Sequence, residues 1–99
     1  LTTRMIAHFK FDYAVIGCSA LDQDGDVLDF DFQEVTVSQT IIAQARQTFL
    51  VADHSKFQRH APVRITSLSK LDRFYTDLAL VPPLATACKT WQTDVRLCA

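Results

Sequence analysis

Residues Tyr13-Ala14-Val15-Ile16-Gly17-Cys18 form a nearly unbroken apolar run with a glycine close to its end. Such a run is typical of a strand that is covered on both faces, as in a parallel sheet. The run Phe49-Leu50-Val51-Ala52 repeats the pattern and stops at Asp53. Weaker runs of the same kind predict further strands at residues 63–66, 74–76 and 94–98. We therefore expect five strands in this chain.

Segments with helical spacing separate these strands. Between the first two strands, residues 32–47 place apolar or small side chains on one helical face, at Val37, Ser38, Ile41, Ile42 and Ala45. Asp31 precedes this segment and Glu34 follows three residues later, as in a capping box. A short helix is expected around residues 5–9, and Pro82-Pro83 can begin another that runs to Trp91. The alternation favours an α/β fold with an open, mostly parallel sheet and flanking helices, whose ligands bind beyond the carboxyl ends of the strands.

The composition limits the size and the class of the protein. The 99 residues, with 48% hydrophobic and 21% charged side chains, can bury one small core and leave no room for a second domain. Ten basic against eleven acidic residues give a net charge of −1, so we expect no DNA binding by this segment alone. Three cysteines without CxxC spacing favour the reducing cytoplasm. No apolar run approaches the roughly 20 residues that span a bilayer, so no membrane partner is expected.

An acidic run between the first strand and the helix has to be considered as a calcium loop. It contains no basic residue, and its acids are Asp22, Asp24, Asp26, Asp29, Asp31 and Glu34. The register of an EF-hand argues against calcium, because with Gly25 in the sixth position Ala20 would stand first and Asp31 would replace the usual glutamate. We expect no metal ion and interpret Asp24-Gly25 as a polar turn.

The densest polar cluster follows directly on the second apolar run, in Ala52-Asp53-His54-Ser55-Lys56-Phe57. A loop in this position faces the ligand side of a parallel sheet. Asp53 is suited to accept hydrogen bonds from sugar hydroxyls, and Lys56 is suited to neutralise a phosphate or to pair with Asp53 when no ligand is bound. A surface turn without function fits the same residues. Glu34 leans toward the sheet by its helical spacing, and it either faces a ligand or only caps its helix.

The patterns of common catalytic sites are not found. Ser55 beside His54 is no catalytic triad, because adjacent residues of an extended chain point apart. His54 and His60 lack the spacing and the cysteines of a zinc site. Gly17 and Gly25 are the only glycines, so the sequence contains neither a GxGxxG turn nor a P-loop. We therefore expect no catalytic residue and no cofactor.

Taken in order, several short motifs resemble the carboxy-terminal sensor domain of the DeoR family of bacterial transcriptional regulators. They are Phe11-Asp12-Tyr13-Ala14-Val15-Ile16-Gly17, Leu21-Asp22-Gln23-Asp24-Gly25, Leu28-Asp29-Phe30-Asp31, Glu34-Val35, Val51-Ala52-Asp53-His54-Ser55-Lys56-Phe57 and Thr76-Asp77. Each motif alone is weak, but the ordered set is specific. The resemblance covers residues 11–77 and is greatest to the glycerol-3-phosphate repressor-like subgroup.

The resemblance implies a fold and a function. The sensor domain of this family is similar in fold to ribose-5-phosphate isomerase and glucosamine-6-phosphate deaminase, and it binds a phosphorylated sugar or related metabolite to control DNA binding. We expect residues 1–99 to be the C-terminal part of such an effector-binding domain, without catalytic activity. The helix-turn-helix domain and a glycine-containing phosphate loop are expected upstream, since the chain starts without an initiator Met. Carried over position by position, the ligand-binding residues are Asp12, Gly17, Glu34, Asp53 and Lys56.

Two other functions remain open, together with the state of assembly. A sugar-phosphate isomerase or deaminase would use Glu34 or Asp53 as a base close to a substrate carbon. A phosphoacceptor signalling domain would bind magnesium through acids at strand ends, but here Lys56 follows Asp53 too closely and the paired acids after the first strand are not adjacent. An exposed sheet edge would favour pairing with another copy, so we expect a homo-oligomer.

Overall fold

The structure of the chain is a computed structural model, and it describes residues 2–98. Its elements follow one another as α1 (Thr2–Ile6), β1 (Phe11–Ile16), β2 (Ala20–Leu21), β3 (Asp26–Asp29), α2 (Phe32–Gln44), β4 (Ala45–Val51), the 3-10 turn η1 (His54–Lys56), β5 (Val63–Ser67), the 3-10 turn η2 (Leu68–Lys70), β6 (Arg73–Thr76), α3 (Pro82–Trp91) and β7 (Asp94–Leu97). None of the described helices is long and apolar enough to cross a membrane.

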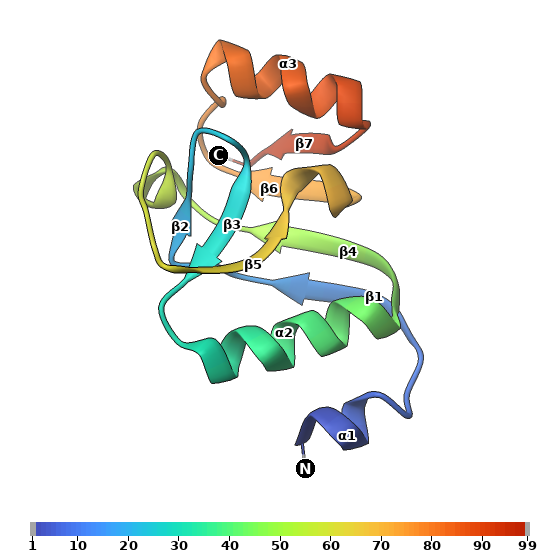
Figure 1. Cartoon of the computed structure of the whole chain (residues 1–99). Coiled ribbons are helices and arrows are strands. Elements are labelled where there is room, and N and C mark those ends of the chain that lie inside the picture. Colours follow the sequence, from blue (N-terminus) through green and yellow to red (C-terminus); the bar gives the residue numbers. More distant parts are fainter. Residues whose placement is uncertain (1, 99) are drawn as a thin grey trace.

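Four parallel strands form the main sheet, in the order β1-β4-β6-β7 (Figure 1). The crossover from β1 to β4 contains α2, and the crossover from β6 to β7 contains α3. The predicted α/β fold with an open, mostly parallel sheet and flanking helices is thus confirmed. Four of the five predicted strands lie in this sheet, close to their predicted positions.

The remaining strands form a second sheet, which the sequence did not predict. β5, at residues 63–67, pairs antiparallel with β3, and β3 pairs antiparallel with β2. β2 and β3 could not be recognised from the sequence because both are short and β3 lies within the acidic run. The turn between them is the predicted polar turn, since the N–H of Gly25 donates to the carbonyl of Asp22 at 3.1 Å. The Asp22 carboxylate accepts from the N–H groups of Asp24 and Asp26, at 3.0 and 2.9 Å.

The helix α2 begins where the capping pattern predicts. The Asp31 carboxylate accepts hydrogen bonds from the N–H groups of Gln33 and Glu34, at 2.8 and 3.3 Å. This pairs two amides that would otherwise lack partners in the first turn. The helix ends at Gln44 rather than at residue 47, because Ala45 is already extended, with φ −97° and ψ 144°, and begins β4.

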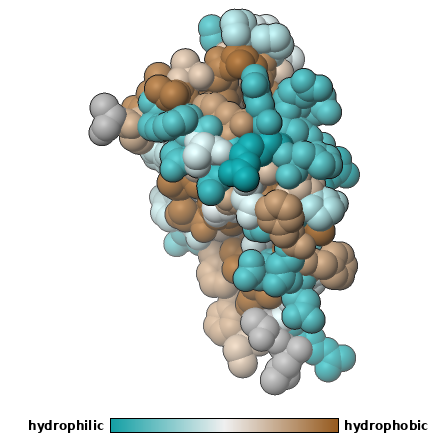
Figure 2. Space-filling model, turned by 90° about the vertical axis from the view of Figure 1, so that its left-hand side faces the viewer, coloured by the Kyte–Doolittle hydropathy of each residue, from teal (hydrophilic) through white to brown (hydrophobic). Residues whose placement is uncertain are grey.

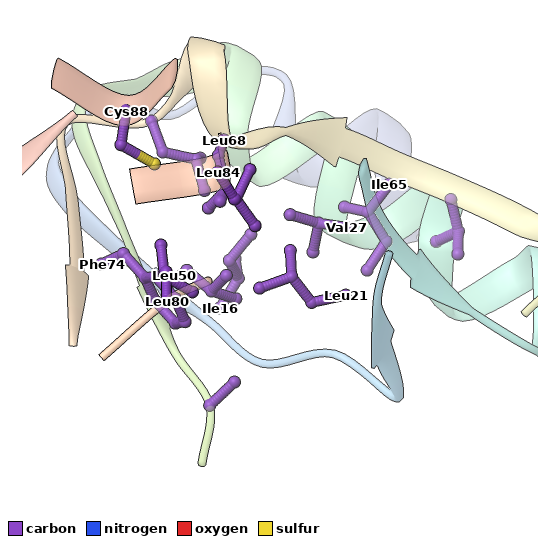
Figure 3. Packing of buried hydrophobic residues seen from close by; sticks show 13 residues of the cluster. Ile16, Leu21, Val27, Leu50, Ile65, Leu68, Phe74, Leu80, Leu84 and Cys88 are labelled. Atoms are coloured by element: carbon purple, nitrogen blue, oxygen red, sulfur yellow. The ribbon is translucent and has the colours of Figure 1, made fainter. Parts of the chain in front are cut away.

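The hydrophobic core lies between the inner face of the main sheet, the second sheet and α3. Leu50 and Phe74 from the main sheet are fully buried, as is Val27 from β3 (Figure 3). Leu84 and Cys88 reach the same cluster from α3. Burying a side chain of leucine size contributes about 1.5–3 kcal/mol, so this cluster is the main source of stability.

The opposite face of the main sheet is not covered by residues 2–98. We call it the outer face, and its aromatic and aliphatic side chains are Tyr13, Val15, Phe49, Val51 and Tyr75. Tyr13 and Val15 are 64% and 67% exposed, while Ala14 and Ile16 on the same strand are buried. The prediction that this strand is covered on both faces is therefore wrong for the described part of the chain. Parallel sheets generally have both faces covered, so the outer face is an unusual surface.

Candidate ligand-binding site

Three polar segments meet where the parallel strands end. Gly17 follows β1, Asp53 comes shortly after β4, and Asp77 follows β6. The register of the sheet aligns Ile16 with Leu50, so these segments lie next to one another on the side to which the arrows of β1 and β4 point in Figure 1. Figure 2 faces this side and shows hydrophilic side chains grouped from its centre to its right-hand edge, with hydrophobic ones above and below them. This is the edge at which open α/β sheets bind ligands.

The loop after β4 holds Asp53 as an ionised acceptor. The Asp53 Oδ1 atom accepts from the Ser55 N–H at 3.0 Å and from the Ser55 hydroxyl. These bonds hold the pKa of the Asp53 carboxyl below its usual value, with a smaller contribution from the charge of Lys56. Among the described residues, no hydrogen bond occupies Oδ2 of Asp53, so this oxygen is an open acceptor.

His54 and Asp77 join the loop after β4 to the end of β6. The His54 N–H donates to Asp77 Oδ1 at 2.8 Å, and the Nδ1 atom of the His54 ring lies 2.6 Å from Oδ2. This pairing raises the pKa of His54 and lowers the pKa of Asp77. The sequence spacing argued only against a zinc site at His54 and did not predict this contact. The Thr76-Asp77 motif at a strand end was the one available signal.

Lys56 lies at the end of η1 and is half-buried. It takes part in no salt bridge within residues 2–98, so the alternative in which Lys56 pairs with Asp53 in the ligand-free chain is wrong. Asp53 bonds to Ser55 instead. Cys18, which follows Gly17, is close enough to feel the charge of Lys56, although burial dominates and raises the pKa of this thiol to about 11. Lys56 therefore belongs to the loop after β4 and lies near the loop after β1.

The two remaining predicted site residues, Glu34 and Asp12, lie in different parts of the fold. Glu34 lies in the first turn of α2, which leads straight back into β4, so it is at the same end of the sheet as Gly17. Its side chain is exposed, and Val35 faces the core, so the prediction that Glu34 leans toward the sheet is wrong. Asp12 is near the start of β1, roughly 16 Å from Gly17 at ~3.3 Å per residue. It lies 4.0 Å from Arg46 in an exposed ion pair.

A shallow hollow lies beside Asp53 and Asp77 at the ends of β4 and β6. It has a volume of about 200 Å³ and is lined by Val51, Ala52, Asp53, Tyr75, Thr76, Asp77 and Cys98. Ligand pockets for small molecules usually measure about 300–1,000 Å³, so this hollow is smaller than a typical ligand pocket. A larger hollow of about 360 Å³ between α3 and β7 is mainly apolar and does not suit a phosphorylated ligand. The described residues contain no group of three or more potential metal ligands.

The comparison with known families agrees with the ordered motifs. Residues 1–78 match the family described as the DeoR C terminal sensor domain. The chain belongs to the DeoR family. The resemblance that the sequence motifs carry is thereby confirmed.

Relatives of this DeoR-family chain are named as transcriptional regulators. It is 48% identical over 75 residues to the glycerol-3-phosphate regulon repressor of Haemophilus influenzae, covering 76% of this chain and 29% of that protein. This chain is 42% identical over 84 residues to the Escherichia coli protein of the same name, and the match covers 85% of this chain and 32% of that protein. This chain is 33% identical over 92 residues to the Escherichia coli HTH-type transcriptional repressor CsqR, and the match covers 93% of this chain and 34% of that protein. The DeoR-family chain thus spans about a third of the length of these relatives, none of which is named as an enzyme.

Proposed function

We propose that this chain is part of the effector-sensing domain of a bacterial transcriptional repressor of sugar metabolism, and that it binds a phosphorylated sugar or a related metabolite. The observation that carries the proposal is the meeting of Gly17, Asp53 and Lys56 at one end of the sheet in a DeoR-family chain. Binding of the effector would control a helix-turn-helix domain elsewhere in the full-length protein. Such a repressor acts on DNA in the cytoplasm, where the three free thiols of this chain stay reduced.

Each residue of the proposed site has a distinct task. Lys56 supplies positive charge to the phosphate, and the open oxygen of Asp53 accepts from a hydroxyl. A Cβ added to Gly17 would meet nothing nearer than the Val51 carbonyl oxygen at 3.9 Å, so the fold itself does not require this glycine. Close approach of a ligand to the backbone would require it. Glu34 lies in the first turn of α2, and the ligand-binding roles of Glu34 and Asp12 stay predictions from the resemblance alone.

The test is calorimetric titration of the chain with phosphorylated sugars and glycerol-3-phosphate, with each mixture followed by NMR. We expect saturable binding and an unchanged ligand. Conversion of the ligand to an isomer or a deaminated product would show that the chain is a sugar-phosphate isomerase or deaminase instead of a sensor, with Glu34 or Asp53 as its base. A magnesium-dependent acyl phosphate on an aspartate would favour the phosphoacceptor alternative.

We also propose that the protein forms a homo-oligomer through the outer face of the main sheet. The exposed residues Tyr13, Val15 and Val51 support this, because exposed apolar surface of this kind marks interaction sites. Val15→Glu is expected to shift the chain toward monomer in sedimentation velocity, whereas Leu78→Glu, at an exposed position outside this face, is expected to leave its association unchanged. A monomer at all concentrations of the unaltered chain would refute the proposal.

A further inference from the structure

The loop between β4 and β5 is tied to the end of β6 at its beginning. His54, the first residue of η1, makes two contacts with Asp77, one through its backbone N–H at 2.8 Å and one through its ring at 2.6 Å. Both oxygens of the Asp77 carboxylate are used, so the contact fixes the direction of the loop as well as its distance from β6. Charge-assisted hydrogen bonds of this kind are shorter and stronger than neutral ones.

The same loop is tied to the core just after η1. The ring of Phe57 contacts the buried ring of Phe74, with centroids 6.2 Å apart, and the backbone of Phe57 forms a bridge with Leu21. Phe57 is therefore an apolar anchor that does not depend on Asp77. Ser55 and Lys56 are the two residues between the polar anchor at His54 and this apolar anchor.

We infer that Asp77 is a positioning residue, which holds His54 so that the loop presents Asp53 and Lys56 together toward an anionic ligand. This inference rests on the function proposed above, because it concerns the same site. Without Asp77, the loop keeps the apolar anchor at Phe57. It loses the polar anchor at His54, which lies between Asp53 and Lys56 in the sequence. The Lys56 N–H, which donates to the Asp53 carbonyl at 3.1 Å, would then open more often.

The experiment compares Asp77→Ala, Asp77→Asn and the control Asp94→Ala in the whole chain. Asp94 is also an exposed carboxylate, paired with Arg96 at 2.8 Å, but it lies at the start of β7. Hydrogen exchange at the Lys56 amide is read by NMR without ligand, and affinity is read by titration with glycerol-3-phosphate and inorganic phosphate. Circular dichroism verifies that each variant is folded.

We expect Asp77→Ala to raise the exchange rate of the Lys56 amide about tenfold and to weaken glycerol-3-phosphate binding by about the same factor. Asp77→Asn keeps an oxygen for the His54 N–H and should restore part of both quantities. Asp94→Ala should change neither.

Two results would overturn the positioning role of Asp77. One is weaker binding in Asp77→Ala with unchanged exchange at Lys56, because Asp77 would then contact the ligand directly. The other is unchanged exchange and unchanged affinity. If the unaltered chain bound neither probe, the proposed function itself would be overturned, so the two failures are distinguishable.

Discussion

The ring of Trp91 lies directly against Gly25, so that a Cβ added to Gly25 would stand 3.1 Å from its Cζ3 atom. Gly25 forms the turn between β2 and β3, and its φ of +84° is one that other residues rarely adopt. Trp91 ends α3, so this contact seats the helix on the second sheet.

Gly25→Ala is therefore expected to destabilise the chain by about 2 kcal/mol, from the left-handed φ and the close contact with Trp91 together. Urea unfolding measures the loss. An unchanged midpoint would show that α3 can move away from the turn at no cost.

Gly17→Ala is the matched substitution at the proposed site, and it should leave the stability nearly unchanged. Its new methyl group would meet only ordinary van der Waals contact, and no left-handed φ is involved. Ligand binding should weaken, because the methyl group would occupy the space that a ligand needs near the backbone. Equal affinity of Gly17→Ala and the unaltered chain would remove Gly17 from the site.

Asp31→Ala removes the carboxylate that caps α2 and should cost about 1 kcal/mol of stability. Thermal unfolding is a suitable measurement, and Asp31→Asn, which keeps an acceptor, is the control. If Asp31→Asn lost as much stability as Asp31→Ala, charge rather than the hydrogen bonds would be responsible.

The pairing with Asp77 should make His54 titrate above its usual pKa of 6.5. Because the folded-state pKa is the higher one, the stabilising effect is complete below pH 6.5 and is lost as the pH rises through the raised value. NMR titration of the ring protons measures this pKa, and Asp77→Asn should lower it. A midpoint that Asp77→Asn leaves in place would show that the His54–Asp77 contact does not persist in solution.

Local patterns were sufficient for the strands of the main sheet and for the two longer helices. β1 and β4 contain most of the two apolar runs, the capping aspartate directly precedes α2, and the paired prolines begin α3. β3 could not be recognised in the same way, because its sequence, Asp26-Val27-Leu28-Asp29, belongs to the acidic run. Its strand conformation depends on pairing with β5, which lies more than thirty residues later in the chain.

The candidate site was partly predictable for a similar reason. Parallel strands bring their carboxyl ends together, so the positions of Gly17 and Asp53 after apolar runs predicted that they meet. The contact of His54 with Asp77 spans 23 residues and depends on the register of β4 and β6, which the sequence does not specify. A resemblance in sequence shows the order of residues along the chain but not the distances between them in the fold. For this reason Asp12 was grouped with Gly17, although almost the whole length of β1 lies between them.

The most direct test of the proposed function compares the affinity of Lys56→Ala for glycerol-3-phosphate with that of Lys70→Ala. Lys70 is an exposed lysine at the end of η2, shortly before the start of β6 and so at the opposite end of the sheet from the site. We expect Lys56→Ala to bind roughly 10–100-fold more weakly, as for the loss of a hydrogen bond to a charged group, and Lys70→Ala to bind like the unaltered chain. Equal affinity of all three proteins would contradict a phosphate site at the carboxyl ends of the strands.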